Sequence, residues 1–239
     1  MLKYIINDLQ SHGHDVHVRK DKLMKNFILE DVVILDTETT GLDENAEVVE
    51  LGILDYAGNE LFNEKFKPMF AKMSPEASAV NGITNEVLSN AKPFSEYVDQ
   101  LSKVLEGKVI FCYNTEFDAR LMEQTAQLYG QEEKVNQWFE LSGDVMQEWQ
   151  DFINVPNARG TGFKLSEACK AMDIIDTQKH QALGDCDMTL QLLKSMQVKE
   201  VPTPEKLLNS VSERKYDRIA ACLYAEDNID QDLADGLEM

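Results

Sequence analysis

The sequence predicts an α/β fold whose mixed sheet has three antiparallel strands first and parallel strands after them, flanked by helices. Residues 32–35 are four aliphatic residues in a row, which is typical of a central strand buried on both faces. Two strand-like segments follow at 47–55 and 60–67, with a hairpin turn at 56–59 between them. Beyond residue 94, helical patterns alternate with one more short apolar strand, as they do in α/β chains.

The later elements are located by apolar spacing and by Gly and Pro punctuation. They are expected as short helical pieces at 74–91, a helix at 94–105, a strand at 109–113, and helices at 114–129, 164–172 and 180–196. Residues 131–163 are less regular, with a short strand or helix near 141–146 and a loop at 154–162. The pattern therefore predicts a core domain over residues 29–198.

Two regions flank this domain. Residues 1–28 form an N-terminal appendage with a basic cluster at Arg19, Lys20, Lys22 and Lys25. The cluster is either a contact for nucleic acid or a partner, or simply a solvated helix face, and we favour the second interpretation. Residues 199–239 form a C-terminal extension, in which a Pro-rich linker leads to one or two small helices at 204–224 and then to an acidic tail.

Composition places the chain among soluble globular proteins. Its 239 residues are 43% hydrophobic and 28% charged. No apolar run approaches the roughly 18 residues that span a bilayer, so no membrane association is expected. The cysteines include no Cys-x-x-Cys pair, which indicates free thiols in a reducing, cytoplasmic setting. They are Cys112, Cys169, Cys186 and Cys222.

The formal net charge of −20 predicts weak, salt-sensitive contact with nucleic acid rather than tight wrapping of a duplex. It does not exclude a nucleic-acid enzyme, because local charge and bound metal decide what happens at a site. Solubility explains most of the acidity.

Asp36 and Glu38 end the first strand, and strand alternation points both side chains to the same side. Two carboxylates at the end of a buried strand need a cation or a proton nearby. The alternative is a strand that ends in a polar turn with both acids in water. Further acids favour the first interpretation: Asp118 follows Asn114 by four residues at a helix start, and Asp185 follows His180 by five. Four carboxylates and one His favour Mg²⁺ or Mn²⁺ over zinc.

Three motifs resemble those of the DnaQ-like family of 3′–5′ exonucleases, in the branch named for its Asp-Glu-Asp-Asp-His set. They are Asp-Thr-Glu-Thr-Thr-Gly-Leu at 36–42, Asn-Thr-Glu-Phe-Asp at 114–118 and His-Gln-Ala-Leu-Gly-Asp at 180–185. Residues 79–84 are similar to the family's Gly-Ile-Thr segment, and the resemblance covers about 30–197. There are two departures, since Tyr113 and Asn81 stand where the family often has His, and these bear on contacts to the terminal nucleotide.

The resemblance implies a ribonuclease H-like fold and two-metal hydrolysis that releases nucleoside 5′-monophosphates. Two Mg²⁺ ions, with Mn²⁺ as a substitute, are expected on Asp36, Glu38, Asp118 and Asp185, with Asp36 as the bridge. His180 is expected to act as the general base, a role that the unperturbed pKa of a histidine side chain, about 6.5, suits. The terminal nucleotide is expected to contact Thr39, Thr40, Gly41, Leu42, Asn81, Ile83 and Asn114.

Several functions remain open at this stage. The first is digestion of DNA 3′ ends, single-stranded or frayed, which is favoured because segment 180–187 and the compact domain resemble DNA-degrading members of the family. The second is trimming of RNA 3′ ends, because discrimination of the 2′-hydroxyl depends on pocket shape. The third is a binding module or a proofreading subunit held by a polymerase, with the two termini as contacts for a replication or repair protein.

Overall fold

The computed structural model describes residues 29–154, 162–175 and 181–223. Within them a five-stranded sheet has the order β3-β2-β1-β4-β5. The strands are β1 (Val32–Thr39), β2 (Val48–Asp55), β3 (Glu60–Lys65), β4 (Val109–Cys112) and β5 (Ser142–Asp144). β1, β2 and β3 pair antiparallel, and β4 and β5 continue parallel to β1. The predicted mixed sheet is therefore confirmed.

The helices surround this sheet. They are α2 (Pro75–Asn81), α3 (Asn85–Leu88), α4 (Val98–Leu105), α5 (Thr115–Gln127), α6 (Glu132–Trp138), α7 (Val145–Ile153), α8 (Leu165–Ala171), α9 (Ala182–Val198), α10 (Pro204–Ser210) and α11 (Glu213–Leu223). Short 3₁₀ turns lie at η3 (Leu29–Asp31) and η4 (Phe94–Glu96). The N-terminal region 1–28, the acidic tail, His180 and most of the loop expected at 154–162 lie outside the described residues.

Two segments differ from the sequence-based expectation. The helix expected at 94–105 is divided, because residues 94–96 form the 3₁₀ turn η4 before α4 begins at Val98. The segment expected to be less regular contains α6, β5 and α7 in succession. Each of these elements has nine residues or fewer, which is too short for hydrophobic periodicity to stand out.

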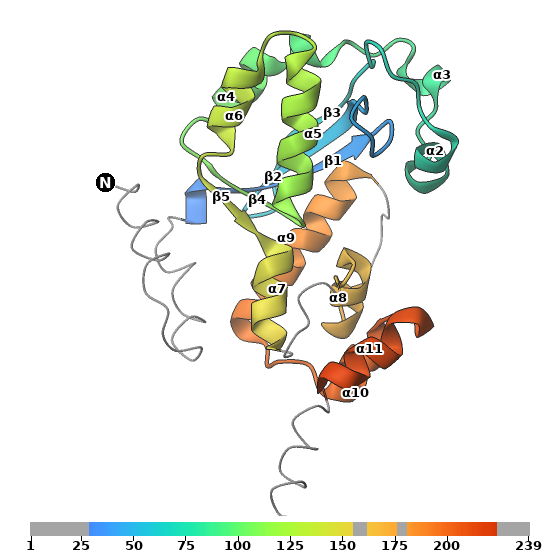
Figure 1. Cartoon of the computed structure of the whole chain (residues 1–239). Coiled ribbons are helices and arrows are strands. Elements are labelled where there is room, and N and C mark those ends of the chain that lie inside the picture. Colours follow the sequence, from blue (N-terminus) through green and yellow to red (C-terminus); the bar gives the residue numbers. More distant parts are fainter. Residues whose placement is uncertain (1–28, 155–161, 176–180, 224–239) are drawn as a thin grey trace, which may run out of the picture.

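The sheet separates two hydrophobic cores, and Figure 1 shows the helices on its two faces. α4, α5 and α6 cover one face and α7, α8 and α9 cover the other. Residues of β1 alternate between the cores: Val33 and Leu35 face α5, while Val32 and Ile34 face α9. All four are fully buried, as expected for the aliphatic run.

The C-terminal helices α10 and α11 pack beyond α8 (Figure 1). Leu207, Leu208 and Ile219 are buried in the same core as α8 and α9. Thr203 caps α10 by accepting from the Lys206 backbone N–H at 3.4 Å, and Pro204 occupies the first turn. The Pro-rich linker signal thus marks the start of a helix.

Two compositional expectations can be compared with the described residues. Cys112, Cys169 and Cys186 are free thiols, all buried, and burial raises the pKa of each. Among the described helices, none is long and apolar enough to cross a membrane.

Candidate active site

Three acids converge where β1 meets the first turn of α9. Carboxylate oxygens of Asp36, Glu38 and Asp185 all lie within 4.8 Å of one another. Asp36 and Glu38 share a face of β1, and Asp185 lies on the helix that covers this face. All three are partly buried, and a cluster of oxygen donors alone suits a hard divalent cation.

A glycine allows α9 to approach the acids. Gly52 of β2 lies opposite Asp36 in the strand register. A Cβ atom at position 52 would lie 2.6 Å from the backbone nitrogen of Leu183 and 2.7 Å from the carbonyl carbon of Ala182. Since α9 touches the sheet backbone here, Asp185 is brought close to β1.

Asp118 reaches β1 from the opposite side of the sheet. Its Oδ1 accepts from the Thr37 backbone N–H at 3.1 Å and from the Thr37 hydroxyl at 2.7 Å. β4 pairs with β1 only as far as Ile34, so Thr37 lies beyond the parallel ladder. The backbone hydrogen bond therefore links the first turn of α5 to the strand that carries Asp36 and Glu38.

Asp144 supports Asp118, and the sequence analysis did not select it. Its carboxylate accepts from the backbone N–H groups of Asn114 at 3.4 Å and Thr115 at 3.1 Å. It also caps α7 through Met146 and Gln147, at 2.8 and 3.1 Å. Asn114 adopts a left-handed conformation (φ 74°) just before α5, so this one carboxylate holds the turn in place. In the sequence, an Asp directly before an amphipathic segment indicates a helix N-cap, and this pattern could have identified Asp144.

Burial and mutual repulsion raise the pKa values of acids in the cluster. Burial, followed by the charges of Asp118, Asp185, Glu38 and Glu50, raises the pKa of Asp36 well above its usual range. Burial also raises the pKa of Glu38 to about 7, with Asp185 and Glu50 adding to the effect and Asn81 and Lys65 opposing it.

The pKa of Asp118 also rises to about 7 through burial, despite its hydrogen bonds from Thr37. A divalent cation among these groups would relieve the repulsion, so the residues fit a bound metal.

The segment expected to seat a terminal nucleotide forms a compact turn beside the acids. Thr39 donates its hydroxyl to the Gly41 carbonyl at 2.7 Å, and the Thr40 hydroxyl accepts from Glu47 N–H at 2.9 Å. Leu42 is 74% exposed and so is available for contact. Asn81 donates toward the Thr39 carbonyl at 3.5 Å.

Ile83 differs from its neighbours in this segment. Its side chain is buried with Val49, Met73 and Leu88 in a small separate core. Its backbone N–H donates to the Asn81 side chain at 3.0 Å. Ile83 therefore supports this turn from beneath.

The two family departures have different surroundings. Asn81 hydrogen-bonds Glu38, which lowers the pKa of that acid. Tyr113 instead donates its hydroxyl to the Phe163 carbonyl at 2.7 Å and packs against the α9-side core. Tyr113 thus anchors the segment before α8. His180 lies outside the described residues, directly before Gln181, the N-cap residue of α9.

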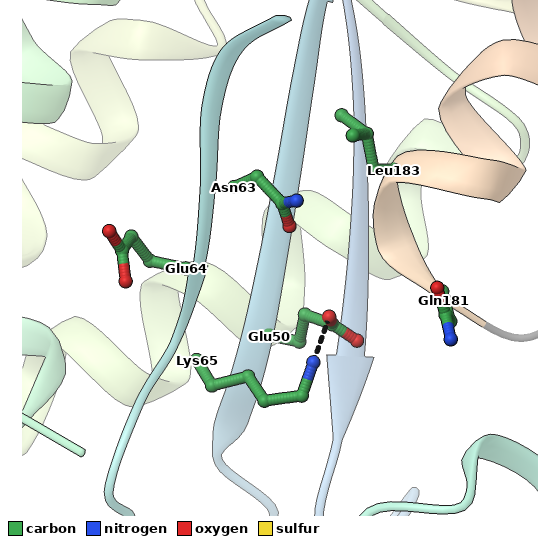
Figure 2. Close-up of a pocket in the computed structure, with 6 residues that line it drawn as sticks. All are labelled: Glu50, Asn63, Glu64, Lys65, Gln181 and Leu183. Carbon is green, nitrogen blue, oxygen red and sulfur yellow. Dashed lines mark hydrogen bonds and ion pairs between the residues drawn. The ribbon is translucent and has the colours of Figure 1, made fainter.

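A groove adjoins the acid cluster at the edge of the sheet (Figure 2). It has a volume of about 400 Å³ and is lined by Glu50, Asn63, Glu64, Lys65, Gln181 and Leu183. Glu50, another residue that the sequence analysis did not select, lies opposite Glu38 on β2 and forms an ion pair with Lys65 of β3. A mixed α/β sheet with acids gathered at the end of its central strand is an arrangement that suits a metal-dependent enzyme.

Comparison with known proteins identifies the family. The chain matches the RNase_T exonuclease family over residues 33–193. It is 32% identical over 178 residues to "Uncharacterized exonuclease CP81" of Escherichia phage 186, covering 72% of this chain and 91% of that protein. The chain therefore belongs to the exonuclease family, in the DnaQ-like group, and is a nuclease that acts on nucleic acid.

Other relatives match only in part. The DNA polymerase III subunit epsilon of Escherichia coli K12 is 28% identical over 100 residues, 38% of this chain and 41% of that subunit. PolC-type DNA polymerase III of Thermotoga maritima is 24% identical over 190 residues, 75% of this chain but 13% of the polymerase. The matches thus span 41% of the epsilon subunit and 13% of the PolC-type polymerase.

Solved structures share the fold. The nuclease domain of 3′hExo, bound to rAMP, has a TM-score of 0.59 at 17% identity, covering 69% of this chain and 90% of that one. Escherichia coli exonuclease I, in complex with a dT13 oligonucleotide, has a TM-score of 0.58 at 16% identity, covering 74% and 45%. At such identities these matches bear on the fold alone.

Proposed function

We propose that this protein is a metal-dependent 3′–5′ exonuclease that releases nucleoside 5′-monophosphates from the 3′ ends of single-stranded or frayed DNA. The observation that carries the proposal is the convergence of Asp36, Glu38 and Asp185 within 4.8 Å in a chain of the exonuclease family.

These three acids would hold the metal, and Asp118 would complete the set from the α5 side. Asp36 would be the central ligand of this set, since the charges of Asp118, Asp185 and Glu38 all act on it. Bound divalent ions, Mg²⁺ in the first instance, would supply an activated water and stabilise charge on the scissile phosphate.

The chain's own groups would then position the reaction. His180 would accept the proton of the attacking water as general base, next to the start of α9. Thr37 would keep Asp118 oriented through its two hydrogen bonds, and Asn81 would do the same for Glu38. These contacts would limit the movement of both carboxylates while the phosphate is bound.

The turn after β1 would seat the terminal nucleotide. Leu42 presents an exposed apolar side chain that would contact the terminal base. The backbone from Thr39 to Leu42, with Asn81, Ile83 and Asn114, would contact its sugar and phosphate. The short ladder between Thr40 and Glu47 would keep this turn rigid, since the Thr40 N–H also donates to the Glu47 carbonyl at 2.9 Å.

DNA is favoured by the names of the partly matching relatives, which are DNA polymerase III proteins. RNA is the alternative, since one structural neighbour is bound to rAMP. The same relatives support attachment to a polymerase or to another replication or repair protein as a second arrangement.

The test is digestion of matched DNA and RNA oligonucleotides, both 3′-tailed and labelled at the 5′ end, with Mg²⁺, with Mn²⁺ and with chelator. We expect a metal-dependent ladder that shortens from the 3′ end, faster on DNA, and absent in Asp185→Ala. Asp187→Asn is the matched control, because Asp187 lies two residues further along α9 and bonds Gln191. Faster digestion of RNA would show that RNA, not DNA, is the preferred substrate. No digestion by folded protein would overturn the activity.

A further inference from the structure

A row of charged side chains crosses the sheet beside the acid cluster. Glu38 of β1 pairs with Glu50 of β2, and Glu50 pairs with Lys65 of β3. Directly paired residues project from the same face, so all three lie on the face that α9 covers. The acid cluster therefore continues across the sheet and ends in a cation.

Glu50 is held in an unusual setting. The residue is 4% exposed, and one carboxylate oxygen pairs with the Lys65 ammonium. The other oxygen, Oε2, is buried without a hydrogen-bond partner among the described residues. A buried carboxylate in this position stays ionised only with a cation beside it, and the Lys65 ammonium supplies that positive charge to Glu50.

Lys65 differs from Glu50 in its accessibility. Its side chain is 38% exposed and lies along the groove between β3 and the start of α9. Figure 2 shows the charged ends of Glu50 and Lys65 meeting there, opposite Gln181 and Leu183, with Glu64 pointing away. The ammonium can consequently remain hydrated while it neutralises Glu50.

The charges of Glu50 and Lys65 act electrostatically on two of the proposed metal ligands. Glu50 acts on Asp36 and Glu38, and Lys65 acts on Glu38 with the opposite sign. We propose that Lys65, held by Glu50, is an internal counter-ion of the acid cluster and weakens the binding of divalent cations there. This inference rests on the proposed metal site. Lys65 would act on that site through Glu50 and would not itself bind the metal.

The charge argument predicts opposite effects for the two partners. Lys65→Met removes a positive charge near the site and frees Glu50, so a cation should bind more tightly. Glu50→Gln removes a negative charge and leaves the ammonium unpaired, so a cation should bind more weakly. For a divalent ion several ångströms away, each change corresponds to about three- to tenfold in the dissociation constant. Lys65→Arg should stay within about twofold of wild type, because it keeps the charge.

The measurement is calorimetric titration of chelator-treated full-length protein with Mn²⁺, together with melting temperatures with and without Mn²⁺. Lys65→Met should melt lower than wild type without metal and recover most of the loss with Mn²⁺. The double variant Glu50→Gln/Lys65→Met keeps the net charge and should bind Mn²⁺ with near wild-type affinity, which tests the idea even if Lys65→Met does not fold. Lys134→Met is the control, because Lys134 pairs with Asp99 between α6 and α4.

The outcomes separate the two proposals. If wild type binds no Mn²⁺, the proposed metal-dependent function fails. If wild type binds Mn²⁺ but Lys65→Met and Glu50→Gln both match it, Lys65 only stabilises the strands and the counter-ion inference is wrong. Equal loss of melting temperature in Lys65→Met with and without Mn²⁺ would lead to the same conclusion.

Discussion

The two faces of strands β1 and β2 are built from the same two stretches of chain but differ in chemistry. The face toward α5 is apolar over most of its length, with Val33, Leu35, Leu51 and Ile53 all fully buried. The face toward α9 begins with Val32 and Ile34 and then changes to acids. On that second face, the central strand ends in Asp36 and Glu38.

The difference shows how the fold separates stability from chemistry. Side chains alternate along a strand, so an apolar residue and an acid can be neighbours in sequence and face different surroundings. The α5 face fixes the strands, and the α9 face uses that fixed position to hold repelling charges together. The following predictions test this separation, beginning with the largest expected effect.

Replacing an acid on the α9 face should abolish activity without unfolding the protein. Asp36→Ala is expected to lose several orders of magnitude in the rate of oligonucleotide digestion, because it removes the central ligand. Removing one of several repelling carboxylates should leave the melting temperature of the metal-free protein unchanged or raise it. Kinetics and circular dichroism on the same sample check both parts. A large loss of folded structure would show that Asp36 belongs to the scaffold.

The proposed base should have a smaller effect. His180→Ala is expected to lose roughly 10²–10⁴-fold in rate, the usual worth of a general base. Mn²⁺ affinity, measured by calorimetry, should stay near wild type, because His180 is not one of the proposed ligands. A rate near wild type would show that His180 is not the general base.

Neighbouring residues on the two faces of β2 should respond differently to alanine. Leu51→Ala leaves a cavity under α5 and should cost about 2–5 kcal/mol of stability, with activity per folded molecule unchanged. Gly52→Ala places a Cβ against Leu183 and should cost about 1–3 kcal/mol through overpacking. It should also reduce activity per folded molecule, because α9 and Asp185 must move.

Denaturant unfolding combined with active-site kinetics distinguishes the two variants. Equal specific activities in Leu51→Ala and Gly52→Ala would mean that the position of α9 does not limit the chemistry.

The pH dependence of stability should be the smallest effect. Glu38 has its pKa raised from 4.5 to about 7 in the folded state. A raised acid pKa means that its stabilisation is complete at low pH and is lost as pH rises from 4.5 through about 7. Metal-free protein should therefore melt a few degrees lower at about pH 8 than at about pH 5.

Mg²⁺ should reduce this slope, and Glu38→Gln should remove part of it, because the pKa values of Asp36 and Asp118 are raised as well. The Glu38→Gln control is needed because the net charge of −20 also destabilises the folded state as pH rises. An unchanged slope in Glu38→Gln would place the pH dependence in Asp36, Asp118 or the general charge instead of Glu38.

Sequence reasoning identified the strand-end acids because their signal is local. Four aliphatic residues followed by Asp36 and Glu38 define a strand and its polar end without any knowledge of the rest of the fold. The same reasoning placed Asp185 near a helix start, and the structure brings it to the other two. Residues 131–163 were less predictable, because short elements such as β5 carry little periodicity.

Other features depend on contacts that no local pattern encodes. The bond from Thr37 to Asp118 joins residues 81 positions apart. The pairing of Glu38, Glu50 and Lys65 depends on strand register, which includes an irregularity between Ile53 and Leu54. Gly52 could be recognised as a close approach only once α9 was placed against it.

Asp144 couples two separate helices at the α5 end of the site. Its carboxylate ties the turn at Asn114 and Thr115 to the first turn of α7, so the α5 end of the site depends on residues about thirty positions later. The placement of Asp118 therefore depends on the segment that begins α7 as well as on α5 itself. A permuted chain with new ends at the exposed turn after β2 would keep it, since Gly58 and Asn59 lie outside every one of these contacts. A break in the chain is thus expected to be tolerated where it leaves the contacts of this carboxylate intact.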